Sequence, residues 1–135
     1  MATAFSIDRF LAAPPITRAR EIERGLPIAA LRDVLADGAV TLADLVGIVG
    51  KRRTLDRRLA EDEVLTLEES DRLVRFAEVL AQAEHVVGSR REAMEWLRKP
   101  KRRLEDARPI DLLRTHSGTE LVTNLLNLAK HGMLA

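Results

Sequence analysis

Apolar residues recur every three or four positions along most of this chain, and this spacing limits the fold more than any other feature of the sequence. The first clear series is Ile28, Leu31, Val34 and Leu35. Such a period places apolar side chains along one face of an α-helix. Aromatic residues make up only 3% of the chain, and few segments are rich in the β-branched and aromatic residues that favour strands. The sequence therefore predicts an all-α protein with an aliphatic core.

Capping residues, glycines and prolines divide this pattern into seven expected helices joined by short connections. Thr66 and Glu69 form a capping-box pattern at the start of the longest helix. Gly38 and Gly88 lie where helices commonly end, and Ser117 is expected to cap the last helix. The predicted helical ranges are 27–37, 41–49, 53–60, 66–87, 89–99, 109–115 and 117–131.

The periodic pattern also assigns residues to the core. Leu67 and Ala81 on the longest helix, and Leu121 on the last helix, are expected to face inward. Trp96 is the only tryptophan in the chain and falls on the expected buried face of the helix over 89–99. It is therefore predicted to be a structural anchor.

Three regions are expected along the chain. Residues 1–24 are expected to form a flexible N-terminal arm. Pro14 and Pro15 follow Ala13, and a proline pushes the preceding residue toward extended conformations. A helix-turn-helix domain with a long spine helix is expected over 25–88, and a small helical domain over 89–135.

The composition points to a cytoplasmic protein without a membrane segment. No apolar run approaches the roughly 20 residues that span a bilayer. Asp8 and Arg9 interrupt the N-terminal stretch, so it does not resemble a secretory signal. The absence of cysteine excludes disulfides and thiolate chemistry.

The charges are segregated although the net charge is only +1. Residues 51–58 contain five basic residues and one acidic residue, residues 61–71 contain six acidic residues and no basic one, and residues 90–103 contain seven basic residues and two acidic ones. Such segregation indicates separate interaction surfaces.

The segment over 41–60 predicts a helix-turn-helix whose second helix is basic. In this arrangement the second helix presents its polar face to the major groove of DNA. Lysine and arginine neutralise phosphates, and arginine can also recognise guanine edges. The usual turn has further ordered residues after its glycine, whereas here Gly50 is followed directly by basic residues. The alternative is a solvated surface helix. The candidate DNA-binding residues are Lys51, Arg52, Arg53, Thr54, Arg57 and Arg58.

The basic stretch after Trp96 allows two interpretations. It could bind nucleic acid through its charge, but it has no interleaved aromatic residues for base stacking. It could instead be a connector that Pro100 and Pro109 delimit and whose charges are solvated. Composition favours the connector.

No set of residues predicts catalysis, a metal site or a cofactor. His85, His116 and His131 lie on three different expected elements, and no paired spacing supports a metal site. The sequence therefore predicts that the protein is not an enzyme.

The C-terminal part of the chain resembles the toxin-binding domain of Xre/MbcA/ParS-type antitoxins. The matching positions are Ala93, Trp96, Leu97, Pro100, Leu104, Pro109, Leu112, Leu113, Thr115, Gly118, Val122, Leu126 and Gly132. The region upstream is similar to the Xre-like helix-turn-helix of the same antitoxins. Family members often carry glycines before the second proline, where this chain has Glu105, Asp106 and Ala107.

This resemblance implies an antitoxin of a type II toxin–antitoxin system. Such antitoxins bind a RES-domain toxin that consumes NAD or transfers ADP-ribose from it, block its active site, and often repress their own operon. The implied partners are the toxin and operator DNA. Met133 and Leu134 form a short apolar tail, which is either a plug for the toxin pocket or a frayed terminus. The candidate toxin-binding residues are Thr115, His116, Ser117, Lys130, His131, Gly132, Met133 and Leu134.

Two functions from different classes therefore remain open. The first is a neutralising antitoxin with a DNA-binding half, and the second is a stand-alone helix-turn-helix transcription regulator. Because helix-turn-helix proteins commonly bind two-fold symmetric sites, we expect a homodimer formed mainly by the N-terminal half.

Overall fold

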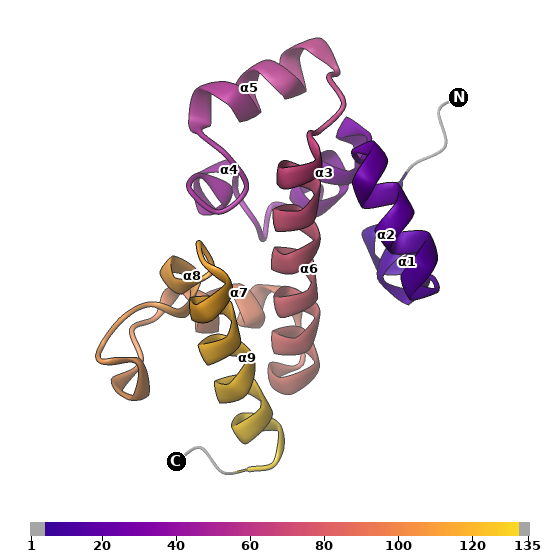
Figure 1. Cartoon of the computed structure of the whole chain (residues 1–135). Helices are drawn as coiled ribbons and strands as arrows, with labels where there is room; N and C mark the ends of the chain where they lie inside the picture. Colours follow the sequence, from indigo (N-terminus) through magenta and orange to yellow (C-terminus); the bar gives the residue numbers. More distant parts are fainter. Residues whose placement is uncertain (1–4, 133–135) are drawn as a thin grey trace. The chain divides into compact units, whose positions relative to one another are not determined.

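The computed structural model describes residues 5–132, and every regular element in that range is helical (Figure 1). The all-α prediction is thus confirmed. The chain divides into two compact units, residues 1–77 and 78–135. The predicted boundary after Gly88 differs from this division, because the long helix α6 (Leu67–Val87) contributes residues to both units.

Unit 1 contains five helices and the first half of α6. The five are α1 (Ile7–Ala12), α2 (Pro15–Arg24), α3 (Ile28–Leu35), α4 (Leu42–Leu45) and α5 (Arg52–Glu61). Helix α3 packs against α1 and α5, and α4 packs against α5. Aliphatic side chains fill the core, among them Leu31, Leu45, Leu55 and Leu73, none of which is exposed.

The prediction of a flexible arm over residues 1–24 is wrong for the described part of that range. Helix α1 buries Ile7 and Phe10, and the Ile7 backbone N–H donates a hydrogen bond to Asp33 Oδ2 on α3 at 2.9 Å. The proline pair does not abolish helix here. It separates two helices, because Pro15 occupies the first turn of α2, where a missing N–H costs nothing.

The helix predicted over 41–49 is shorter than the apolar spacing indicated. Thr41 caps α4 through a capping box with Asp44, but α4 ends at Leu45. Gly47 then has a φ of 86°, a conformation that favours glycine. Ile48 and Val49 are buried in the turn that follows. The apolar spacing continued through this turn because its side chains also reach the core.

The start of α6 agrees with the sequence, but two of its predicted core positions do not. The Thr66 N–H donates to Glu69 Oε1 and the Glu69 N–H donates to Thr66 Oγ1, which completes the predicted capping box. Leu67 is 45% exposed and Ala81 is exposed as well. The buried stripe instead includes Phe76, which was not among the predicted core positions.

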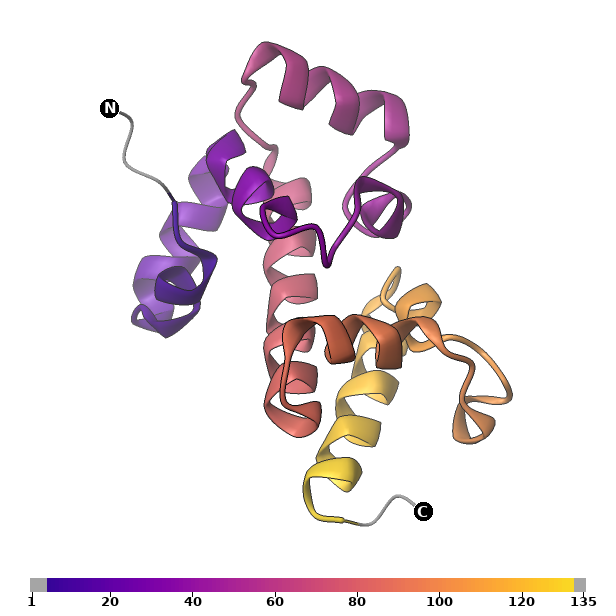
Figure 2. The same cartoon turned by 180° about the vertical axis from the view of Figure 1, so that it is seen from behind.

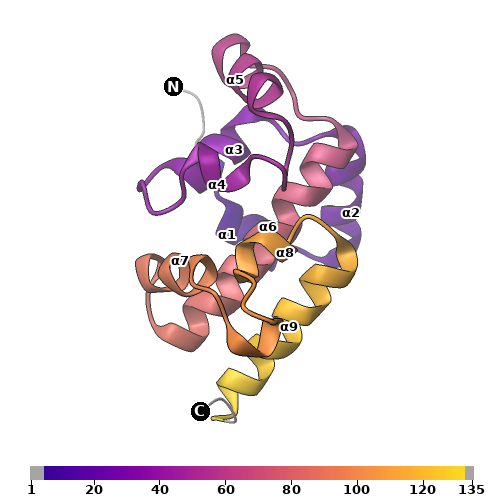
Figure 3. The same cartoon turned by 90° about the vertical axis from the view of Figure 1, so that its left-hand side faces the viewer.

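Unit 2 combines the second half of α6 with three further helices (Figure 3). These are α7 (Arg90–Arg98), α8 (Pro109–Leu112) and α9 (His116–Lys130), and a short 3₁₀ helix, η1 (Arg102–Leu104), lies between α7 and α8. Helix α8 packs against both α7 and α9. Gln82 Nε2 joins α6 to α9 through hydrogen bonds to the Thr123 carbonyl oxygen and to Asn127 Oδ1, at 3.3 and 2.8 Å.

Two capping residues begin the main helices of unit 2. Ser89 Oγ accepts a hydrogen bond from the Glu92 N–H and caps α7. The cap of α9 is Thr115 rather than Ser117, because Thr115 Oγ1 accepts from the Gly118 N–H at 2.9 Å. Leu121 was expected to face inward but is 54% exposed. None of the described helices is long and apolar enough to cross a membrane.

Candidate functional site

The first candidate surface is the exposed face of α5 in unit 1. Helix α4, the turn over 46–51 and α5 follow one another as helix, turn and helix (Figure 1). The turn glycine is Gly47, not Gly50, so buried Ile48 and Val49 are the ordered apolar turn residues that seemed to be missing. The apparent departure from the usual spacing therefore came from placing the turn too late in the sequence.

The structure separates the six predicted DNA-binding residues into two groups. Thr54 and Arg58 are half-buried. The other four are exposed: Lys51, Arg52, Arg53 and Arg57.

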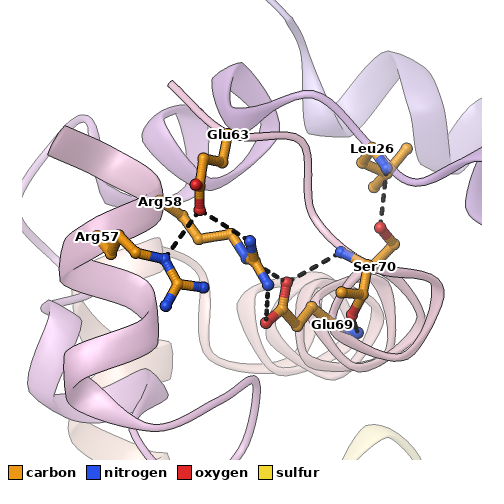
Figure 4. Close-up of polar contacts among 7 residues, drawn as sticks. Leu26, Arg57, Arg58, Glu63, Glu69 and Ser70 are labelled. Carbon is orange, nitrogen blue, oxygen red and sulfur yellow. Dashed lines mark hydrogen bonds and ion pairs between the residues drawn. The ribbon is translucent and has the colours of Figure 1, made fainter. Parts of the chain in front are cut away.

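Arg58 lies inward, against the start of α6 (Figure 4). Its Nε and Nη2 donate to the two carboxylate oxygens of Glu69 at 2.7 and 3.2 Å, and its Nη1 donates to Glu63 Oε1 at 2.9 Å. The Arg58 side chain is only 14% exposed and that of Glu69 only 10%. The prediction that Arg58 lies on the outward face is therefore wrong, because this bidentate pair holds it against α6.

Charge and hydrogen bonding keep both members of this pair ionised. Burial alone would raise the pKa of the Glu69 carboxyl, but hydrogen bonds from Arg58 and from the Thr66 N–H, together with the charge of Arg58, lower that pKa overall. The hydrogen bond to Glu69 is the main reason why the pKa of Arg58 is raised. Glu69 thus both caps α6 and fixes α5, while Ser70 Oγ beside it accepts a hydrogen bond from the Leu26 N–H at 2.8 Å (Figure 4).

The four exposed basic residues differ in how their charges are compensated. Arg57 Nε donates to Glu63 at 3.1 Å, and Arg52 lies 3.5 Å from Asp56. Within residues 5–132, neither Lys51 nor Arg53 has a side-chain ion pair or hydrogen bond. Uncompensated exposed cations are suited to neutralising phosphates.

Trp96 in unit 2 is half-buried and so is not the core anchor that its position on α7 predicted. The fully buried side chains of this helix include Met94 and Leu97. Lys101 Nζ lies 4.6 Å from the centroid of the Trp96 ring, within range of a cation–π interaction. Burial, and to a lesser extent the charge of Lys99, lowers the pKa of the Lys101 ammonium group. Trp96 therefore holds the beginning of the segment that follows α7.

That segment, residues 99–108, is called the connector below. Figure 2 shows it in orange, extending away from α7, α8 and α9. Glu105 and Asp106 have φ values of 55° and 66°, in the left-handed region that glycine adopts without strain. Two consecutive residues of the connector therefore adopt a conformation that side chains other than glycine rarely adopt.

The second candidate surface was predicted at the two ends of α9, and the structure does not bring those ends together. Thr115, His116 and Ser117 are exposed at the beginning of the helix, and Lys130, with His131 after it, is exposed at the end. Fifteen residues of helix rise about 22 Å, so the two groups cannot form one compact site. Gly132 is exposed, and the predicted contacts of Met133 and Leu134 lie outside the described residues.

Gly118 is a feature of unit 2 whose structural role the sequence did not reveal. It is buried within the first turn of α9, and a Cβ added to it would lie 2.0 Å from the Leu112 carbonyl oxygen. Only glycine permits this close approach of α8 and α9. The signal in the sequence was a glycine in the first turn of the last helix, three residues after its cap Thr115.

No group of three or more His, Asp or Glu side chains in the described part of the chain is placed to hold a metal ion. Of the three histidines, His116 lies 3.1 Å from Glu120 on the exposed side of α9. His85 and His131 are exposed on other parts of the chain.

Curated proteins with similar sequences are antitoxins by name. A 74-residue segment is 45% identical to Antitoxin Xre of Pseudomonas putida. This segment covers 55% of this chain but only 46% of that relative. Antitoxin Xre of Photorhabdus laumondii subsp. laumondii is 28% identical over 116 residues, 84% of this chain and 78% of the relative. A protein of Sphingobium sp. named Prs ADP-ribosylating antitoxin is 27% identical over 143 aligned positions, 97% of this chain and 89% of the relative.

Two family models match consecutive parts of the chain. Residues 17–78 match the antitoxin Xre-like helix-turn-helix domain, and residues 82–132 match the antitoxin Xre/MbcA/ParS C-terminal toxin-binding domain. The two matched ranges correspond closely to units 1 and 2 of the structure. The chain therefore belongs to the Xre/MbcA/ParS family of antitoxins, with an Xre-like helix-turn-helix domain followed by a toxin-binding domain.

Proposed function

We propose that this protein neutralises a RES-domain toxin that uses NAD, by binding the toxin through unit 2 and blocking its active site. The observation that carries the proposal is the order of the two matched domains, helix-turn-helix and then toxin-binding. The relative named Prs ADP-ribosylating antitoxin aligns along nearly the whole chain. ADP-ribose transfer consumes NAD, so this name agrees with a toxin of that chemistry.

The C-terminal end of the chain is the proposed plug of the toxin pocket. Deleting residues 132–135 is expected to abolish protection of cells that co-express the toxin, because apolar Met133 and Leu134 would no longer enter a concave apolar site. Growth and cellular NAD would be measured together. Leu134→Glu should reproduce the loss, and Leu134→Met, which keeps the apolar character, should protect. If the truncated protein protects fully, the inhibitory surface lies on the helices instead.

Unit 1 is proposed to bind operator DNA through α5 and so to regulate its own operon. Lys51, Arg52, Arg53 and Arg57 supply the exposed positive face, and Arg58 contributes indirectly by fixing α5. A homodimer formed through unit 1 would present two such helices to a two-fold symmetric site. Exposed apolar residues available for that contact are Ile16, Val64 and Leu67.

Arg53→Ala is expected to weaken binding to a duplex from the chain's own promoter region by about tenfold, since a good arginine contact is worth about 1–3 kcal/mol. The change removes a side chain that has no partner within residues 5–132, so the fold should be unaffected. Fluorescence anisotropy would give the dissociation constants. Arg20→Ala, an exposed arginine on α2, is the matched control. Equal affinities of the two variants would show that α5 does not contact DNA.

The stand-alone regulator remains the second candidate function. It predicts promoter binding that depends on Arg53, together with no protection of cells against the toxin by the full-length protein. The neutralising antitoxin predicts protection even for the Arg53→Ala variant. Measuring promoter binding and toxin protection for the wild type and Arg53→Ala therefore distinguishes the two functions.

A further inference from the structure

The connector between α7 and α8 is an ordered structure rather than a loose linker. The Lys101 N–H donates to the Ala107 carbonyl oxygen at 3.0 Å, and the Asp106 N–H donates back to the Lys101 carbonyl oxygen at 2.9 Å. Hydrogen bonds within η1 and from the Ala107 N–H to Leu104 complete the loop. The contact between Lys101 and Trp96 fixes its beginning.

The loop is maintained although its backbone is strained. Glu105 and Asp106 are consecutive residues in the left-handed region, which costs a non-glycine residue about 1–2 kcal/mol. A solvated linker would not need such a conformation, whereas strained segments that persist are concentrated at functional positions. The strained backbone therefore marks the connector as a candidate binding surface.

The exposed charges of the connector are predominantly positive, because four exposed basic residues, Lys99, Arg102, Arg103 and Arg108, outnumber the exposed Glu105 and Asp106. Arg108 pairs with Asp111 at 2.9 Å, and Lys101 lies over the Trp96 ring. Within residues 5–132, the side chains of Arg102 and Arg103 have neither an ion pair nor a hydrogen bond, and Glu105 and Asp106 do not pair with them. The two arginines are adjacent on η1 and both are exposed.

The chemistry of this surface fits phosphate better than a protein partner. The core of a protein–protein interface is apolar and poor in charge, but the large apolar side chains exposed in the described part of the chain all lie outside the connector. Trp96 is occupied by Lys101, so the connector offers no free ring on which a base could stack. What remains is a pair of guanidinium groups, which bind phosphate oxygens with good geometry.

We propose that the connector is a second DNA contact, in which Arg102 and Arg103 bind backbone phosphates without regard to base sequence. The inference rests on the proposed DNA-binding role of the chain but not on α5 as the reading helix. In this arrangement α5 selects the site, and the connector adds affinity for any duplex.

The salt dependence of binding provides a quantitative test. Each neutralised phosphate contributes about 0.9 to the slope of log affinity against log salt concentration. Removing two contacts should therefore lower that slope by about 1.8. At 50 mM salt the affinity should fall roughly tenfold more than at 200 mM.

The experiment compares the full-length wild type, Arg102→Ala/Arg103→Ala, and Arg91→Ala/Arg114→Ala. The last variant removes two exposed charges of unit 2 outside the connector and so controls for net charge. Fluorescence anisotropy would be measured between 50 and 200 mM salt with a promoter duplex and with a scrambled duplex of the same length. Circular dichroism would confirm that all three proteins are folded.

We expect the slope of log affinity against log salt concentration to be smaller for the connector variant than for the wild type on both duplexes, and to be unchanged for the control variant. Toxin protection should be unchanged for both variants. Equal slopes for the connector variant and the wild type would overturn the inference. So would loss of toxin protection with unchanged DNA binding, which would make the connector a toxin surface. Arg53→Ala would be measured in the same series. Its affinity tests the proposed role of α5 separately from that of the connector.

Discussion

Replacing Glu69 with alanine is expected to lower the free energy of unfolding by about 3 kcal/mol, the size of effect seen when one member of a buried ion pair is removed. The carboxylate accepts two hydrogen bonds from Arg58 and one from the Thr66 N–H. Without it, an arginine side chain that is only 14% exposed loses its main partner, and the first turn of α6 loses half of its capping box.

Urea unfolding of Glu69→Ala and Glu68→Ala, each compared with the wild type, would measure this effect. Glu68 is the adjacent acidic residue in the same helical turn, but it is exposed. Its replacement should change the stability by no more than about 0.5 kcal/mol. If both variants lose the same small amount, the Arg58–Glu69 pair contributes nothing beyond a surface charge.

The pH dependence provides a second readout of the same pair. The pKa of Glu69 is lower in the folded protein than its ordinary value, which is about 4.3. The stabilisation is therefore present above about pH 4.3 and is lost as the pH falls through the folded pKa. The stability difference between the wild type and Glu69→Ala should accordingly shrink in acid.

Gly118→Ala is expected to have the second-largest effect, a loss of about 1–3 kcal/mol from overpacking. The new Cβ would lie 2.0 Å from the carbonyl oxygen and 2.9 Å from the carbonyl carbon of Leu112. These are backbone atoms, so rotation of a side chain cannot relieve the clash, and α8 must move away from α9. Protection against the toxin should fall as well, since both helices belong to the toxin-binding domain.

The control is Ser117→Ala, one residue earlier on the same helix and exposed. Alanine is the better helix former, so this variant should be as stable as the wild type or slightly more so. Thermal unfolding of both variants would compare them. A Gly118→Ala protein that unfolds at the wild-type temperature would show that α8 can shift at little cost.

Local signals in the sequence predicted much of the fold correctly. The capping box at Thr66 was recognised because both of its partners lie within one helical turn. The last helix was recognised by its apolar spacing, but its cap was placed two residues late. Thr115 and Ser117 are both capable caps, and only the hydrogen bond to the Gly118 N–H decides between them.

Features that depend on distant contacts were missed. Periodicity placed Arg58 with the other arginines of α5, because the carboxylate that binds it lies 11 residues away beyond a loop. The N-terminal helices were missed for a similar reason. Phe10 and Ile7 are buried in α1, which packs on α3, and this packing outweighs the local effect of the two prolines.

The candidate sites were predicted less completely than the fold. The basic face of α5 was correctly located on the second helix of a helix-turn-helix, although the turn begins at Val46 rather than after Val49. The two ends of α9 were predicted as one set of toxin-binding residues, but the 15 residues of helix between them keep the two ends apart. The connector was interpreted as solvated, since its backbone conformation could not be derived from its composition.

The bidentate pair between Arg58 and Glu69 also constrains how related sequences can change. A carboxylate left alone at this position would be strongly disfavoured, whereas two apolar side chains of similar volume could replace the pair at little cost. A single substitution at either position leaves one charged side chain without its partner, which is the disfavoured arrangement. Among relatives of this chain, the two positions should therefore vary together, as an arginine with an acid or as two apolar residues, and mixed combinations should be rare.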